Sequence, residues 1–376
     1  METVVLSLIF IYFISIFYEK MQVDKNRKKI KTIIHVNGIR GKSTVSRLID
    51  AGLRDGDRKV FTKVTGTSPR YIDIDGVEKE IVRKGKANIR EQIKILKKVS
   101  GDNLDVLVLE CMAVNPDLQR VCEEKILKAD IGVITNVRED HLDEMGDSLE
   151  KIAYSLSNMI PKNKVLFTSE VNCFNILKNE SEKRGSSIYY AQPKDEYSEI
   201  DFKDNVALAL SVCKELGVEE EVALERMKKY KRDIGVLREI NFKNNKEKKI
   251  TFINALAAND PNSSKKIIDS YKESLKWKNK RYLMINNRRD RVSRMLQYVD
   301  FVKKYGEEFD GIFVSGQSKE IFLKLLKNYE GKVEVLSSIK SFEELEEDSI
   351  IFAVGNICGI GQKIIDSIES RDMKDE

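Results

Sequence analysis

The sequence predicts two α/β domains behind a single N-terminal transmembrane helix, the first domain being built on a doubly wound parallel sheet. Three observations predict this fold class. The chain has 376 residues, which is more than one hydrophobic core usually supports. Short β-branched runs alternate with helical stretches, as in parallel sheets covered by helices. Residues 4–18 (VVLSLIFIYFISIFY) carry no charge, which indicates a membrane segment.

Residues 1–22 are expected to form an uncleaved membrane anchor. As a helix, residues 4–18 would span roughly 22 Å, and Tyr18 with Lys20 would extend the segment to the interface. A signal peptide would need a basic start and a small-residue cleavage site, whereas this chain begins Met-Glu-Thr. The alternative is a buried core helix. Because the cations follow the apolar run, the sequence predicts a single-pass protein of the cell membrane with its body in the cytoplasm.

Positive charge is concentrated near the N-terminus. Residues 1–31 contain six Lys and Arg and three Asp and Glu, so they hold +3 of the net charge of +5. The rest of the chain has no strong positive field, which argues against nucleic-acid binding. Residues 23–31 are expected to be a basic linker that touches anionic lipid heads or a partner. The five cysteines include no C-x-x-C pair, which argues against a disulfide framework or thiolate zinc site and fits a reducing compartment.

The first globular domain is expected over residues 32–236. Its buried strands are predicted from the apolar runs 32–36, 106–109, 131–134 and 165–167. Its helices are predicted directly after residue 44 and over 88–98, 118–128, 149–159 and 204–216, the last ending at Gly217.

The second, smaller domain is expected over residues 237–376. Its strands are predicted at 250–253, 282–285, 312–314 and 350–354, with helices between them. The polar stretch 241–249 (NFKNNKEKK) is either a linker or an exposed hairpin.

A phosphate-binding loop is predicted at residues 38–44 (GIRGKST), between the strand 32–36 and a helix. Glycines let the backbone turn tightly and direct N–H groups at an anion, assisted by the helix N-terminus. Lys42 would neutralise β- and γ-phosphate oxygens, and Ser43 or Thr44 would give a hydroxyl to Mg²⁺. The strict motif G-x-x-x-x-G-K-[ST] is not met, because Val36 occupies the first glycine position. The alternative is an ordinary glycine turn with a solvated lysine.

Two other predicted strands end in polar residues. Glu110 ends the run DVLVLE, at the edge where doubly wound sheets bind ligands, and would hold the Mg²⁺ of a nucleotide; a capping or salt-bridging glutamate is the alternative. His141 lies among aspartates in the loop after 131–134, where a metal or phosphate site is expected. Cys111 is expected to be a buried structural thiol rather than a nucleophile, and His35 a packed core residue.

These elements resemble the Mur ligase family of ATP-dependent amide ligases, which includes peptidoglycan precursor ligases and folylpolyglutamate synthase. The family's phosphate loop, metal-binding Glu, N-x-x-x-D-H-L-D motif and D-N-x-A-L-A adenine-binding helix are matched by residues 37–44, Glu110, 136–143 and 204–209. The resemblance implies a Mur ligase central domain followed by a Rossmann-like C-terminal domain. It also implies ATP and Mg²⁺ as cofactors, with Mn²⁺ as an alternative metal.

Site residues follow from the same resemblance. Those implied for ATP are Asn37, Gly38, Arg40, Gly41, Lys42, Ser43, Thr44, Asn136, Asn205 and Arg238. Those implied for the metal are Ser43, Thr44, Glu110 and His141. Those implied for catalysis are Lys42, Glu110 and His141.

Within the family, the sequence is most similar to the poly-γ-glutamate (capsule) synthase branch, whose members also begin with one membrane segment. The similarity rests on residues 35–45, 65–70, 110–117, 285–291 and 354–357. It implies glutamate, a growing poly-γ-glutamate chain and small polytopic and anchored membrane subunits as partners; a homo-oligomer stays open. Anionic glutamates need cationic holders, and the candidates are Arg70, Arg288, Arg289 and Arg291. Solvated surface arginines are the alternative for these positions.

The sequence departs from the family in two places. The family's carbamylated lysine has no counterpart in residues 153–157 (AYSLS), so a second metal site is either absent or rebuilt. The phosphate loop follows directly on the anchor, so we expect no domain for a uridine nucleotide and no peptidoglycan precursor ligase.

The predicted activity is ATP-dependent formation of an amide between two glutamates. The γ-phosphoryl group of ATP would move to a γ-carboxylate, and the amine of a second glutamate would attack the acyl phosphate, so that ADP and phosphate leave. The alternative is a membrane-anchored P-loop ATPase or kinase that regulates envelope polymer assembly. A nucleotide-binding scaffold is a third hypothesis. The sequence does not decide between L- and D-glutamate.

Overall fold

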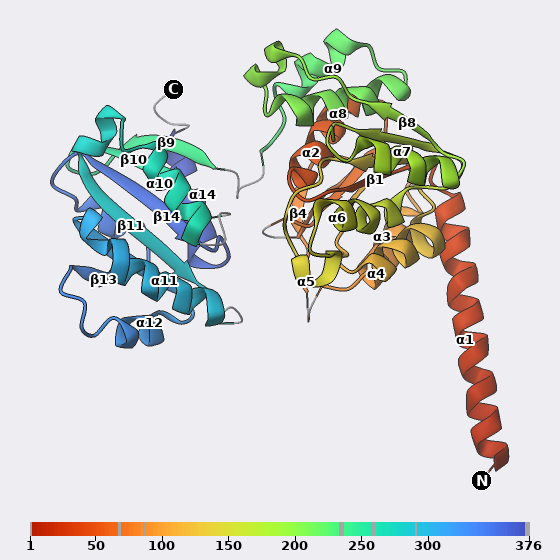
Figure 1. The fold of residues 1–376 in the computed structure, drawn as a ribbon, viewed down its shortest axis with the longest axis horizontal. Helices are drawn as coiled ribbons and strands as arrows, with labels where there is room; N and C mark the ends of the chain where they lie inside the picture. The colour runs from red at the N-terminus through yellow and green to blue at the C-terminus, as the bar shows by residue number, and fades with distance from the viewer. Residues whose placement is uncertain are drawn as a thin grey trace. The chain divides into compact units, whose positions relative to one another are not determined.

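The computed structural model describes residues 2–66, 69–83, 85, 87–232, 237–256, 261–289 and 292–372. The chain forms two compact units, residues 1–232 and 233–376, each built around its own β-sheet (Figure 1). The strand–helix alternation predicted from the sequence is confirmed in both.

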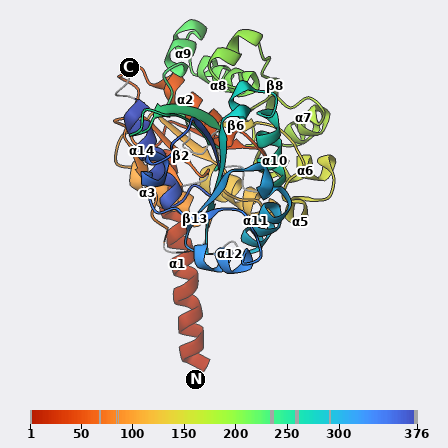
Figure 2. The same ribbon diagram turned by 90° about the vertical axis from the view of Figure 1, so that its left-hand side faces the viewer.

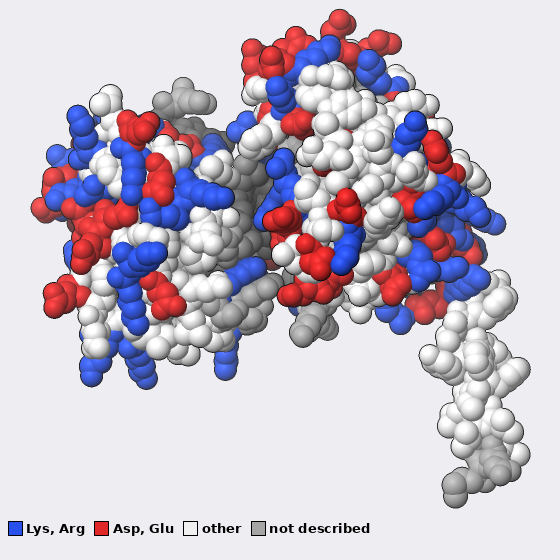
Figure 3. Space-filling model, viewed as in Figure 1, with Lys and Arg blue, Asp and Glu red and all other residues white. Residues whose placement is uncertain are grey.

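Helix α1 (Glu2–Lys28) extends away from the first unit in both ribbon views (Figures 1 and 2). Its outer part is covered by uncharged side chains (Figure 3), and its large apolar residues are exposed. Among the described residues, it is the one helix long and apolar enough to cross a membrane. A core helix would be buried, so that alternative does not describe α1 in this structure.

The segment 23–31 differs from the expected linker, because the helix continues through it to Lys28. Val23 and Ile30 are buried in the core of the first unit. Arg27 pairs with Asp130 at 2.5 Å. The basic segment is therefore part of the folded body.

The first unit contains an eight-stranded sheet in the order β4-β3-β2-β5-β1-β6-β7-β8. The strands are β1 (Thr32–Asn37), β2 (Val60–Val64), β3 (Arg70–Ile72), β4 (Glu78–Glu80), β5 (Val106–Glu110), β6 (Ile131–Ile134), β7 (Val165–Thr168) and β8 (Ser187–Tyr190). All neighbours are parallel except at β3 and β4, which pair antiparallel at one edge. The four predicted strands are confirmed, whereas β2, β3, β4 and β8 were not predicted.

Helices cover both faces of this sheet. Alternate residues of β1 and β5 point to opposite faces, so that Ile34 and Val108 meet one helical layer and Ile33 and Leu107 meet the other. The first layer contains α2 (Lys42–Leu53), α8 (Lys203–Glu215) and α9 (Glu220–Met227). The second contains α3 (Arg90–Val99) and the π-helical turn η1 (Cys122–Leu127), which follows α4 (Pro116–Val121). The remaining helices are α5 (Leu142–Met145), α6 (Leu149–Leu156) and α7 (Phe174–Lys183), with 3₁₀ turns at η2 (Ser157–Met159) and η3 (Asp195–Glu199).

The second unit contains a six-stranded sheet in the order β13-β12-β11-β14-β10-β9. The strands are β9 (Arg238–Lys243), β10 (Lys249–Asn254), β11 (Lys280–Asn287), β12 (Gly311–Gly316), β13 (Val333–Val335) and β14 (Ser349–Gly355). The helices are α10 (Pro261–Ser270), α11 (Val292–Tyr305), α12 (Lys319–Leu325), α13 (Lys340–Glu343) and α14 (Ile360–Asp372), with 3₁₀ turns at η4 (Leu275–Lys278) and η5 (Gly306–Glu308). β9 and β10 pair antiparallel. Residues 241–249 are therefore the hairpin and not a linker.

Candidate active site

The phosphate-binding loop lies between β1 and α2, and it needs glycine at two positions. Gly38 and Gly41 have φ angles of 127° and 82°, which strain residues with a Cβ atom. A Cβ at Gly38 would lie 2.1 Å from Thr135 Oγ1, and one at Gly41 would lie 2.6 Å from Asn205 Oδ1. Both glycines therefore allow a close approach from a different part of the chain.

The loop is held by the residues that follow β6. The Asn136 side chain accepts a hydrogen bond from the Arg40 amide at 3.1 Å and donates to the Arg40 carbonyl at 3.0 Å. The Thr135 hydroxyl donates to the same carbonyl at 2.6 Å. Asn136, expected from the sequence to contact nucleotide, thus also fixes the loop that would cradle it.

Glu110 lies beneath the loop at the carboxyl end of β5, in register with Val36 of β1. The residue is 2 % exposed. Glu110 Oε2 accepts hydrogen bonds from Ser43 Oγ at 2.8 Å and from the Thr65 amide at 2.6 Å. A carboxylate beside a hydroxyl is a suitable pair of oxygen ligands for a hard cation such as Mg²⁺, which also keeps water and phosphate ligands.

Behind Glu110 lies a buried lysine that the sequence reasoning missed. Lys63 Nζ is 2.8 Å from a Glu91 carboxylate oxygen and 3.2 Å from Gln92 Oε1. Gln92 in turn donates to the backbone carbonyl of Glu110 at 3.2 Å. Burial lowers the pKa of Lys63, while the Glu91 carboxylate opposes that shift. The only sequence signal was a charged residue in an otherwise apolar run, VFTKV.

His141 and Asp140 lie on the other side of the loop. Asp140 Oδ2 is 3.1 Å from an Arg40 guanidinium nitrogen. His141 has a φ of 51°, and its Nε2 lies 3.9 Å from Asp140 Oδ1. Among the described residues no three His, Cys, Asp or Glu side chains are grouped closely enough to hold a metal. Thr44 and His141, which the sequence also predicts as metal ligands, therefore stay candidates beside Glu110 and Ser43.

The other residues expected at the nucleotide site lie as follows. Lys42 Nζ donates to the Gly38 carbonyl at 2.7 Å. Thr44 is half-buried in the first turn of α2. Asn205 on α8 is 8 % exposed and lies against Gly41. Asn37 is buried and donates to Gln119 at 2.9 Å, so its side chain has a structural partner.

The cations expected to hold substrate lie in different units. Arg70, at the start of β3, is 3.9 Å from Glu78. Arg288 and Arg289 follow β11 at the carboxyl edge of the second sheet, whereas Arg291 lies outside the described residues. Arg238 pairs with Glu369 of the same unit at 2.9 Å.

A cavity of about 640 Å³ opens at that edge of the second unit. It is lined by Asn287, Arg288, Arg289, Gly316, Gln317, Cys358, Gly359 and Ile360. Asn287 is 6 % exposed, and its Nδ2 has no hydrogen-bond partner among the described residues. A buried amide donor left unpaired favours a ligand that supplies an acceptor oxygen.

Comparison with known protein families decides which chemistry this arrangement serves. The family model for the Mur ligase middle domain matches residues 36–245. The chain belongs to the Mur ligase family. This ligase also matches, over residues 240–371, the model for the poly-gamma-glutamate synthase CapB C-terminal domain.

Individual relatives agree with that assignment. The PGA synthase CapB of Bacillus subtilis (strain 168) is 34% identical over 376 residues, covering 95% of each chain. The capsule biosynthesis protein CapB of Bacillus anthracis is 32% identical, over 93% of this chain and 79% of the relative. A folylpolyglutamate synthase/dihydrofolate synthase from Yersinia pestis, solved with AMPPNP and Mn ion, has a TM-score of 0.62 at 13% identity, covering 94% of this chain and 92% of that one.

This Mur ligase is accordingly an ATP-dependent amide ligase, and the alternative of a regulatory ATPase or kinase is set aside. The predicted fold class is confirmed as well. The shortened phosphate loop, which looked like an imperfect match to the strict motif, lies inside the matched Mur ligase domain.

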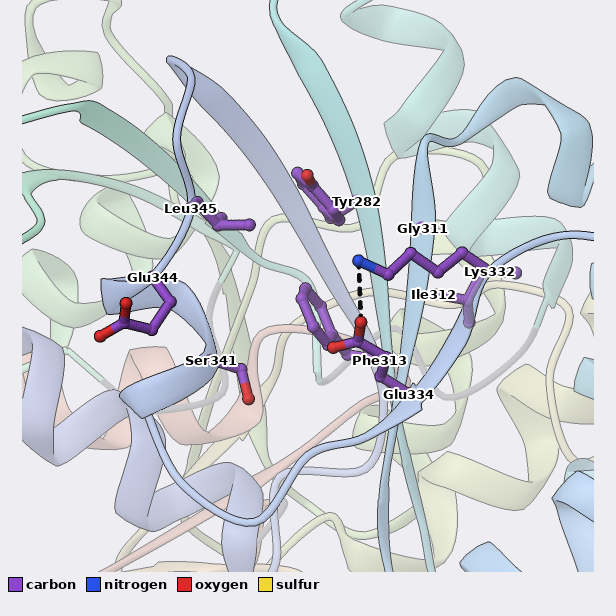
Figure 4. A pocket seen from close by; sticks show the side chains of 9 residues that line it. All are labelled: Tyr282, Gly311, Ile312, Phe313, Lys332, Glu334, Ser341, Glu344 and Leu345. Atoms are coloured by element: carbon purple, nitrogen blue, oxygen red, sulfur yellow. Dashed lines mark ion pairs between the residues drawn. The ribbon is translucent and has the colours of Figure 1, made fainter. Parts of the chain in front are cut away.

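A second cavity of the ligase, of about 330 Å³, lies away from the carboxyl edge of the second sheet (Figure 4). Tyr282 and Phe313 stack on its wall with ring centroids 5.4 Å apart. Lys332 is paired with Glu334 at 2.8 Å, and Glu344 adds another carboxylate. Glu344 in turn lies 3.7 Å from Lys246, so the charged groups at this cavity are already paired with one another, which does not suit the binding of an anionic substrate.

His35 is a core residue, as expected, and it is paired with a buried carboxylate. Its Nδ1 lies 2.8 Å from Glu123 Oε2, and both side chains are buried. Burial disfavours the imidazolium, but the neighbouring Cys111 sulfur and the Glu123 carboxylate raise the pKa of His35 to about 9. Cys111 is itself buried, which agrees with the structural role expected for it.

Proposed function

We propose that this ligase joins glutamate units through γ-amide bonds and so makes poly-γ-glutamate. The observation that carries the proposal is the hydrogen bond between Ser43 and the buried Glu110 beneath the phosphate loop, in a chain 34% identical over 95% of its length to a relative named PGA synthase. The pair supports phosphoryl transfer from ATP, and the relative's name suggests the substrate.

Forming an amide from a free carboxylate requires activation. The γ-phosphoryl group of ATP moves to a glutamate γ-carboxylate oxygen, ADP leaves, and the amine of another glutamate then attacks the acyl phosphate carbon. The amide C–N bond forms, phosphate leaves with the C–O bond electrons, and the amine releases a proton. The work of the protein is positioning and charge neutralisation.

Individual residues take separate parts in this scheme. The main-chain N–H groups of residues 38–44 and the cation of Lys42 hold the ATP phosphates. Glu110 and Ser43 would hold Mg²⁺, or Mn²⁺ in its place, and the bound ion would supply positive charge against the transferred phosphoryl group. Thr44 and His141 are further candidate ligands of this metal. Asn136 and Asn205 align the loop and the nucleotide base.

Carboxylates of glutamate are held by arginines. Arg288 and Arg289 line the 640 Å³ cavity beside Asn287, whose amide nitrogen has no partner in the part of the chain that the structure describes. Guanidinium groups bind carboxylates through paired hydrogen bonds. Arg70 is a further candidate in the first unit, and Arg238 in the second is a candidate for nucleotide contact.

We also propose that α1 anchors the ligase in the cell membrane with the body in the cytoplasm, where ATP is available. A polymer that leaves the cell needs an export route, so small membrane subunits are expected partners of the ligase. The basic residues after the apolar segment support this orientation.

One assay tests the proposed reaction. The full chain in detergent is incubated with ATP, Mg²⁺ and either L- or D-glutamate, and both ADP and γ-linked product are measured. We expect glutamate-dependent ADP release together with amide formation, loss of both in Lys42→Ala, and no loss in Lys178→Ala, an exposed lysine on α7. ATP turnover that is indifferent to glutamate, without any amide product, would overturn the proposal.

A further inference from the structure

Helix α1 continues without a break from its apolar segment into the first unit. The sequence of Glu2–Lys28 contains neither Gly nor Pro, the residues that most often interrupt a helix. Near its end, Asp24 pairs with Lys128 and Arg27 pairs with Asp130, each at 2.5 Å. Val23 is buried in the core that includes α3 and η1. The end of α1 is therefore fixed to the folded unit and cannot act as a flexible tether.

This attachment brings α3 to the end of the apolar segment. The uncharged run ends at Tyr18, and the next residue, Glu19, pairs with Arg90 of α3 at 2.5 Å. The head-group layer on each side of a bilayer is about 5–8 Å thick. If α1 spans the membrane, Arg90 lies at the level of the head groups. Lys94 and Lys97 follow about 6 and 11 Å along α3, compared with a Debye length of about 8 Å at physiological salt.

The surface from the end of the apolar run to the end of α1, about 15 Å farther along the helix, carries unbalanced positive charge. Six exposed lysines on α1, the residue after it and α3 have no ion-pair partner among the residues that the structure describes: Lys20, Lys25, Lys28, Lys29, Lys94 and Lys97. Lys and Arg side chains gather where α1 leaves the first unit (Figure 3). Many other lysines of this unit are neutralised by nearby carboxylates, as Lys151 is by Asp147 at 2.8 Å.

We propose that this surface, formed by residues 20–29 and α3, docks on the head groups of an anionic bilayer, and that α1 holds it there as a rigid strut. The inference rests on the proposed membrane anchorage. Attraction between the exposed lysines and anionic lipid stabilises the docked orientation, and the membrane-spanning helix alone does not supply this stabilisation. The charge complementarity and the fixed helix select a lipid surface over a soluble partner.

The test places a fluorophore near the N-terminus of α3 in the full chain. Ala87 is exposed, and the native cysteines are buried except for the half-buried Cys358, so Ala87→Cys in a Cys358→Ser background gives one labelling site. The protein is reconstituted in nanodiscs of phosphatidylcholine alone or with phosphatidylglycerol, each containing brominated lipid as a short-range quencher. We expect quenching at least about threefold stronger with the anionic lipid.

A charge-reversed variant and a matched control test whether the lysines of α3 cause the stronger quenching with anionic lipid. Lys94→Glu/Lys97→Glu should remove the anionic enhancement. Lys228→Glu/Lys229→Glu makes the same change in charge at the end of α9, which lies at the opposite end of the first unit from α1 (Figures 1 and 2), and should leave the enhancement intact. ATP hydrolysis with glutamate should be unchanged in both.

The outcomes separate the docking proposal from the proposed anchorage. Protein that is released from membranes by alkaline carbonate overturns the anchorage and the docking together. Anchored protein whose quenching is equal in the two lipid compositions, or unaffected by Lys94→Glu/Lys97→Glu, overturns the docking alone. Quenching that requires an added membrane protein instead of anionic lipid would identify a protein partner and also overturn the proposal.

Discussion

Substituting Gly41 by Ala tests whether the phosphate loop is shaped by the approach of α8. Two effects act at this position. A φ of 82° costs a residue with a Cβ about 1–2 kcal/mol. In addition, the new methyl group would lie 2.6 Å from Asn205 Oδ1, well inside the 3.4 Å at which ordinary contact begins. The Asn205 side chain must therefore move away from the loop, and we expect ATP binding to weaken at least about tenfold, or 1.4 kcal/mol.

Gly217→Ala is the matched control, because Gly217 has a φ of 77° and nothing within 4 Å of the added Cβ. Both variants should lose the backbone contribution of about 1–2 kcal/mol to the free energy of unfolding in chemical denaturation, and Gly41→Ala should lose more because of the contact with Asn205. Only Gly41→Ala should lose affinity in a titration with a fluorescent ATP analogue, while Gly217→Ala stays within about twofold of the parent. Equal loss of ATP affinity in both variants, or full affinity in Gly41→Ala, would refute the assignment of Asn205 and Gly41 to one nucleotide site.

Three further predictions concern the groups around the loop. Glu110→Gln keeps the hydrogen bond from Ser43 but removes a charge that a metal needs, so turnover should fall about 10²-fold or more, measured as ADP release at saturating ATP; near-normal turnover would argue against a metal at Glu110. Asn136→Ala removes both hydrogen bonds to the Arg40 backbone and should weaken ATP binding by about 1–2 kcal/mol in the titration with a fluorescent ATP analogue. Unchanged affinity would contradict the role of Asn136 in holding the loop. Because the pKa of His35 is raised from 6.5 to about 9, its contacts with Cys111 and Glu123 should together contribute up to about 3 kcal/mol below pH 6.5 and lose this contribution as the pH rises through about 9. The free energy of unfolding, measured by chemical denaturation at pH 6 and pH 10, should show this loss in the parent and not in His35→Gln. An equal change between the two pH values in both proteins would contradict the prediction.

The central strands of the first sheet could be predicted because each is a short apolar run with a polar residue at its carboxyl end. The strand β2 was missed for a physical reason. It reads VFTKV, and a lysine in a fully buried strand is credible only when a carboxylate such as Glu91 is known to face it. The edge strands β3 and β4 have three residues each, too few to show a periodic pattern.

The charge of His35 could not be predicted from the sequence for a similar reason. An apolar run around a histidine correctly predicts a core position, but its charge depends on Glu123, which is 88 residues away in the sequence. Sequence spacing does not reveal such a pair, because the sheet brings the two elements together only after folding. The same holds for the cavity at Asn287, which is also lined by Cys358, Gly359 and Ile360 from the loop after β14.

The shortened phosphate loop can be explained by what surrounds it. A full-length loop closes over the phosphates largely through its own glycine-rich turn. Here β1 leads almost directly into the turn, and residues outside the loop hold it in place. Gly38 packs against Thr135, and the Asn136 side chain forms hydrogen bonds with both the N–H and the carbonyl of Arg40. Because Thr135 and Asn136 follow β6, the strand next to β1, the loop and the β6 edge form one structural element. A substitution in the residues after β6 should therefore affect nucleotide binding as strongly as one within the loop itself.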